Sequence, residues 1–246
     1  MRIKVLLCGL VAVALLAGAA SLSSLTWPMG VVAAILQLIF AFAWPRMVRS
    51  DAPWPISIII ALCSLAATAA TIFMPGTSVM SHGVEVIAVG VLLVFISQVL
   101  RGAEAEGRLA GVVSGVTGMV LGVLGSAWAA SAQASYGFGL AVVTVISLLG
   151  AGAIAVTRLP NRITMVLAPV IAVALGAAAS ALPVDITWYQ GAVMGLVAGL
   201  LVGSLRALAL ASKSVRNLSG IVGLSSGIIL LSGASSWYIM EVLAFI

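Results

Sequence analysis

The side chains able to carry chemistry in this sequence are few: one histidine, two cysteines and six acidic residues. His82 and Glu85 lie one helical turn apart, so a helix would project both from the same face. Asp185 and Glu241 occur in two other segments that contain no Lys or Arg. The sequence predicts that His82, Glu85 and Asp185 line an acidic outer vestibule. The competing interpretation is that they are solvated residues at helix ends.

The residue patterns of the common enzyme classes are missing. Because the chain has a single histidine, no serine has a histidine partner on a helix deep in the membrane. The segment GLSSG (223–227) also departs from the G-x-S-x-G frame of serine hydrolases. His82 and Glu85 alone are too few ligands for a metal site. Cys8 and Cys63 are expected to be buried thiols. We therefore predict no catalytic residue, no metal, no cofactor and no enzymatic activity.

The composition is that of a membrane protein. Of the 246 residues, 63% are hydrophobic and only 7% are charged, whereas a soluble chain carries about 25% charged residues. So few charges cannot solvate the surface of a water-soluble domain. This excludes an ordinary soluble enzyme, a disordered chain and a nucleic-acid-binding domain, and it predicts membrane lipid as the surrounding partner.

Nine apolar runs are long enough to be transmembrane helices, each of which needs about 20 residues. The stretch 109–157 contains no charged residue and is too long for one crossing, so we predict that it turns at SAQASYG (131–137). Strand-like alternation is absent, and backbone groups in lipid need internal partners, which favours helices. The predicted fold is an all-α transmembrane bundle with spans at 5–22, 26–44, 54–74, 83–100, 109–130, 136–157, 163–182, 188–206 and 218–240.

The first span has a second interpretation. MRIK followed by a short apolar run resembles a secretory signal. Cleavage near Ala19–Ala20 would leave eight spans. We favour an uncleaved, signal-anchor-like helix over residues 1–24.

The basic residues predict how the spans run. With the amino terminus in the cytoplasm, the nine spans place all eleven Lys and Arg on the cytoplasmic side, as the positive-inside rule expects. All Trp and Tyr residues fall at predicted span ends, where aromatic rings favour the headgroup region. The carboxyl terminus would then lie outside.

An internal repeat is visible when the sequence is aligned with itself. Pro75, Arg108 and Trp128 recur as Pro183, Arg216 and Trp237 at similar spacing. Two four-helix repeats, 25–132 and 133–246, follow from this match. Because four spans return the chain to the same side, the repeats would be parallel and related by an axis along the membrane normal.

Glycines at helical spacing predict close helix crossings, because small residues let backbones approach in lipid. Intramolecular packing is the favoured interpretation, and self-association or contact with another membrane protein is the alternative. Pro169 lies inside the seventh span and is expected to kink it. The packing glycines are Gly111, Gly115, Gly118 and Gly122 in the fifth span and Gly195, Gly199 and Gly203 in the eighth.

FISQVLR (95–101), followed by Arg108 and a Gly/Val-rich helix, resembles polytopic proteins of bacterial inner membranes whose activity is uncharacterised. The resemblance covers about the middle third of the chain. It implies a location in the bacterial inner membrane but supplies no activity or site residues.

Two functions fit these observations. The first is a small permease or exporter for a neutral, amphipathic or lipid-like solute, with a pathway between the two repeats. The absence of a charged residue at mid-membrane disfavours an ionic solute. The alternative is a non-catalytic membrane subunit or scaffold in cell-envelope assembly, which short loops and glycine stripes would also suit.

Overall fold

A computed structural model of the chain describes residues 2–22, 27–74, 81–102, 106–211 and 217–243. All regular secondary structure in these ranges is helical. Eight helical segments are long and apolar enough to cross a membrane, and in the first helix the apolar stretch Cys8–Ser21 is shorter. The chain is therefore an integral membrane protein, and the predicted all-α bundle is confirmed. The helices are α1 (Arg2–Ser21), α2 (Trp27–Met47), α3 (Pro53–Phe73), α4 (Ser81–Val99), α5 (Arg108–Leu124), α6 (Ala127–Ser131), α7 (Gly137–Val156), α8 (Asn161–Ala179), α9 (Trp188–Ala211) and α10 (Leu218–Leu243).

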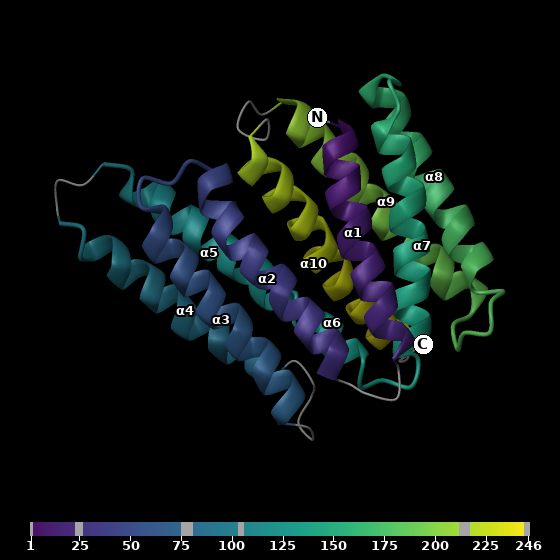
Figure 1. Ribbon diagram of the computed structural model, residues 1–246, viewed down its shortest axis with the longest axis horizontal. Coiled ribbons are helices and arrows are strands. Elements are labelled where there is room, and N and C mark those ends of the chain that lie inside the picture. Colours follow the sequence, from purple (N-terminus) through teal and green to yellow (C-terminus); the bar gives the residue numbers. More distant parts are fainter. Residues whose placement is uncertain (1, 23–26, 75–80, 103–105, 212–216, 244–246) are drawn as a thin grey trace.

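The helices form two groups with α1 and α10 between them (Figure 1). On one side α3 packs against α2, α4 and α5, and on the other α7, α8 and α9 pack against one another. The last helix, α10, contacts α2, α9 and α1, so it joins the two groups.

The packing within the two predicted repeats is similar in part. The pairs α2–α3 and α7–α8 are both closely packed. However, α5 packs against α3, whereas its counterpart α10 packs mainly against α2 and α9 instead of α8. The division into 25–132 and 133–246 stays a prediction.

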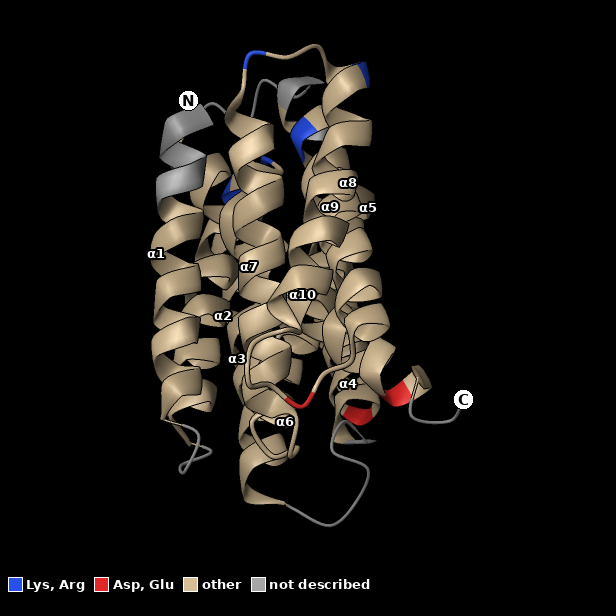
Figure 2. Cartoon of the chain, turned by 90° about the vertical axis from the view of Figure 1, so that its right-hand side faces the viewer, with Lys and Arg blue, Asp and Glu red and all other residues tan. Residues whose placement is uncertain are grey.

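One end of the bundle carries the described Lys and Arg residues, together with Asp51 in the connection 48–52 (Figure 2). The visible Lys and Arg positions gather at the end that carries the amino terminus, and the visible acidic positions gather at the other. We call these the basic end and the acidic end. The basic end holds the connections 48–52 and 157–160, together with Arg206 near the end of α9. Lys213 and Arg216, which the sequence assigns to the same side, lie outside the described residues.

The closest helix crossing joins α8 and α9. A methyl group at Gly195 would lie 2.2 Å from the Ala172 carbonyl oxygen, and one at Gly199 would lie 2.4 Å from the Pro169 Cα. At Gly203 the nearest atom, the Met165 Cα, is 3.8 Å away. The glycine stripe of α9 thus faces α8 within the same chain, and α8 continues as a helix through Pro169.

The glycines of α5 instead receive side chains from neighbouring helices. Gly111 lies against Gln98 and Gly115 against Val94, both of α4. Gly118 lies against Trp44 of α2, and Gly122 lies against Ser64 of α3. Both glycine sets therefore lie at intramolecular contacts.

Candidate functional site

The fifth predicted span is broken near the acidic end. Helix α5 ends at Leu124, and the short α6 begins at Ala127. Between them the backbone tightens: the Gly125 N–H donates to the Gly122 carbonyl at 3.1 Å, and the Ser126 N–H donates to the Val123 carbonyl at 3.0 Å. In a continuous α-helix the Gly122 carbonyl would instead accept from residue 126. The break therefore leaves this carbonyl able to accept from a side chain.

Gln37 of α2 provides that side chain. Its amide nitrogen donates to the Gly122 carbonyl at 2.9 Å, and its amide oxygen accepts from the Thr68 hydroxyl of α3 at 2.8 Å. Gln37 has no exposed surface, so both hydrogen bonds are shielded from water and lipid. A buried amide is stable only when its polar atoms have partners, and here it links α2, α3 and the broken span.

Helix α3 places a row of hydroxyl groups along the same region. Ser57, Ser64, Thr68 and Thr71 fall on one helix face because their spacings approximate whole turns of 3.6 residues. All four are buried, as is Gln37, which faces the row from α2. We call these five residues the polar seam.

Two hydroxyls of the polar seam have no hydrogen-bond partner. The oxygen atoms of Ser57 and Ser64 are both buried and unpartnered. Ser64 faces α5, where a methyl group on Gly122 would lie 2.2 Å from its Oγ. A buried unpartnered hydroxyl is unfavourable by about 1–3 kcal/mol, and Ser50, Ser114 and Ser147 are in the same state elsewhere in the bundle.

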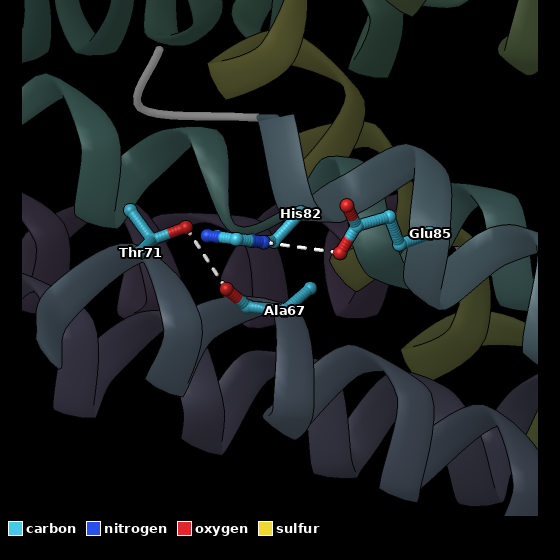
Figure 3. Close-up of polar contacts among 4 residues, drawn as sticks. All are labelled: Ala67, Thr71, His82 and Glu85. Atoms are coloured by element: carbon cyan, nitrogen blue, oxygen red, sulfur yellow. Dashed lines mark hydrogen bonds and ion pairs between the residues drawn. The ribbon is translucent and has the colours of Figure 1, made fainter. Parts of the chain in front are cut away.

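The acidic end of the polar seam is next to His82 and Glu85 (Figure 3). The His82 Nδ1 lies 3.1 Å from a Glu85 carboxylate oxygen, and their side chains are 31% and 75% exposed. The other side of the imidazole ring points toward the Thr71 hydroxyl, which donates to the Ala67 carbonyl at 2.9 Å. Gln133, which follows α6, donates to the Thr71 carbonyl at 2.5 Å. The predicted pair therefore lies beside the acidic end of the seam, a position that we call its mouth.

Asp185 does not join this pair. It lies in the connection between α8 and α9, on the opposite side of the molecule from α4 (Figure 1). Helices α2, α3 and α10 lie between Asp185 and the pair His82–Glu85. The three residues therefore do not form the vestibule expected from the sequence. The structure brings together His82 and Glu85 and leaves Asp185 apart.

Glu241 also has a different neighbour. The Tyr136 hydroxyl donates to its carboxylate at 3.1 Å, which ties the connection before α7 to the end of α10. Burial, the charge of Glu241 and this hydrogen bond together raise the pKa of Tyr136 to about 12, and burial contributes most. Tyr136 thus remains a neutral donor at physiological pH.

Trp44 and Ile60 form an apolar layer across the polar seam on the side of the basic end. Trp44 of α2 lies against Gly118 and donates its indole N–H to the Ser114 carbonyl at 3.0 Å. Ile60 of α3, which is fully buried, also contacts Gly118. This layer lies between Ser64 and Ser57, so the hydroxyls nearest the acidic end are separated from the basic end by apolar groups.

The chemistry of the polar seam is that of uncharged hydrogen bonding. Its five side chains offer hydroxyl and amide groups, and none is ionisable at physiological pH. Within the described ranges, no group of three His, Cys, Asp or Glu side chains could hold a metal ion. The arrangement is suited to holding a neutral polar group.

Sequence reasoning missed most of this site. It identified His82 and Glu85 but gave no role to Thr68, Thr71 or Ser64. A signal was present, since buried Ser and Thr recur on one face of the third span. Comparison with protein-family models, with curated proteins and with solved structures finds no match.

Proposed function

We propose that the protein is a small permease for an uncharged polar or amphipathic solute, and that the polar seam is part of its pathway. The observation that carries this proposal is the fully buried Gln37, hydrogen-bonded to Thr68 and to the Gly122 carbonyl beside a broken span. In transporters, interrupted helices supply backbone polar groups to solute sites inside the membrane.

The charge distribution supports an uncharged solute. No Lys, Arg, Asp or Glu lies in the polar seam, and an ion without a counter-charge in the membrane interior is strongly disfavoured. We infer that the basic end faces the cytoplasm by the positive-inside rule, and that the acidic end with His82 faces outward. The bacterial inner membrane is the proposed location.

The test is solute flux through the purified protein in liposomes. Glycerol entry after an osmotic step is followed by light scattering, because glycerol crosses plain bilayers slowly. Gln37→Met keeps the side-chain volume but loses both hydrogen bonds, and we expect it to lower the flux. The matched control is Thr144→Val, which breaks the buried 2.8 Å hydrogen bond between Thr144 and Ser236 in the other helix group. Equal flux in Gln37→Met and wild type, or no flux above empty liposomes, would contradict the proposal.

One observation favours the alternative function of a membrane scaffold. Helix α4 is the least buried of the eight candidate spans, with 17% of its window inside the bundle. Its outer face exposes Val84, Leu92 and Phe95, and a partner helix or lipid could cover it. Purification in a mild detergent separates the two functions, because stoichiometric recovery of an unrelated membrane protein supports the scaffold.

A further inference from the structure

We propose that the polar seam contains a binding site for one small uncharged molecule carrying both a hydrogen-bond donor and an acceptor, with the Ser64 hydroxyl as its main contact. This inference rests on the proposed permease function and names its solute class. It also assigns a specific position, between the Gln37–Thr68 pair and the Trp44 layer.

The hydrogen-bonding capacity of the seam supports this site. Ser64 Oγ is fully buried and unpartnered, so both its donor and its acceptor capacity are unused. Gln37 donates to the Gly122 carbonyl through its amide nitrogen, which carries a second N–H. Thr68 donates to Gln37 and keeps an acceptor lone pair. These neighbouring groups together offer donors and acceptors to a single neutral molecule.

The same groups define what the molecule must be. A carboxylate would bring a charge without a counter-ion and would offer no donor, so the seam disfavours it. A hydrocarbon would leave the Ser64 hydroxyl unpaired. Hydroxyl compounds and primary amides meet both requirements.

Room for the molecule must come from α5. Because Gly122 has no side chain, α5 approaches Ser64 closely, and even an added methyl group would lie 2.2 Å from the hydroxyl oxygen. The inferred binding therefore requires α5 to move away from α3, and the turn between Leu124 and Ala127, which separates α5 from α6, is where we expect the span to bend. Trp128 of α6 is held by a 2.9 Å hydrogen bond from its indole nitrogen to the Ile229 carbonyl of α10.

The melting temperature of Ser64→Ala tests whether the Ser64 hydroxyl has a structural role. A structural hydroxyl would stabilise the fold, so its loss would lower the melting temperature. An unpartnered hydroxyl destabilises the empty protein, so its removal should leave the melting temperature unchanged or raise it. The same argument applies to Ser147 of α7, which is also buried and unpartnered but lies in the other helix group.

The experiment uses the full chain in nanodiscs and saturation-transfer difference NMR. The probes are acetamide, which is neutral and carries a donor and an acceptor, and acetate, which has nearly the same shape but is charged and lacks a donor. We expect acetamide to bind wild type and Ser147→Ala equally. In Ser64→Ala its binding should weaken by about fivefold, the value of one lost hydrogen bond. Acetate should give no signal that depends on Ser64.

Three results would overturn the inference: acetamide binding that is the same in Ser64→Ala as in wild type, equal binding of acetate, or no acetamide signal at all. The last is expected if only a structural water pairs with Ser64. Glycerol flux without Ser64-dependent binding of acetamide would show that the proposed binding site is wrong, while the proposed permease function would stand. Ser64-dependent binding of acetamide without any glycerol flux would show that the proposed permease function is wrong, while the binding site would stand.

Discussion

Replacing Gly195 of α9 with alanine is expected to destabilise the bundle by separating α8 from α9. The new methyl carbon would lie 2.2 Å from the Ala172 carbonyl oxygen and 2.7 Å from its carbonyl carbon. Ordinary van der Waals contact begins at 3.4 Å, so the methyl is more than an ångström too close. Both atoms belong to the backbone, and no side chain can rotate away. The helices themselves must move apart.

The expected loss is about 1–3 kcal/mol in the free energy of unfolding, the usual effect of overpacking. The better helix propensity of alanine offsets part of it, by about 0.5–1 kcal/mol. Gly203→Ala is the matched control, since it lies on the same stripe with its nearest atom at 3.8 Å. Denaturant unfolding in mixed micelles measures both variants. Equal stability of Gly195→Ala and Gly203→Ala would refute the close-packing argument.

The remaining predictions concern the ends of the bundle and the broken span. Trp128→Phe should lower the unfolding free energy by about 1 kcal/mol, because it removes the indole hydrogen bond to α10, and the same denaturant titration measures it. Above the ordinary Tyr pKa of 10.0, the unfolded chain loses a proton that Tyr136 keeps up to about pH 12 when folded, so stability falls as pH rises through this window. Tyr136→Phe should reduce that alkaline loss in melting temperature, whereas an undiminished loss would place its cause elsewhere. His82→Ala should lower glycerol flux at the mouth of the seam and Asp185→Asn should not, and equal effects of the two would contradict the placement of the mouth.

The spans were predictable because burial in lipid imposes one strong requirement, a run of about 20 apolar residues. Each of the nine predicted runs coincides with a helix, except 109–130, which coincides with α5 and α6 together. The break had a local signal, the pair Gly125–Ser126, because Gly/Ser pairs are common sites of helix kinks, but the distant contact made there was not predictable. It involves a hydrogen bond to Gly122 from Gln37, which is 85 residues away along the chain.

The candidate site was predictable only in part, because the sequence does not say how the helices pack against one another. His82 and Glu85 share a helix, so their contact follows from helical spacing. Asp185 shares only their end of the bundle, and helix packing places it on the opposite side. Thr68 and Gln37 meet because α2 and α3 pack closely. The short connection 48–52 makes these helices neighbours, but the sequence does not specify which of their residues face each other.

The most direct test of the permease account is the reactivity of a cysteine at position 64. In a background of Cys8→Ala and Cys63→Ala, Ser64→Cys is treated in membranes with a small neutral methanethiosulfonate, and Ser147→Cys serves as the control. Because only the thiolate reacts, modification requires that water reach the sulfur. The account predicts that Ser64→Cys is modified, that acetamide slows the reaction, and that Ser147→Cys stays inert. Equal inertness at both positions would show that the polar seam never opens, and the proposed pathway would be wrong.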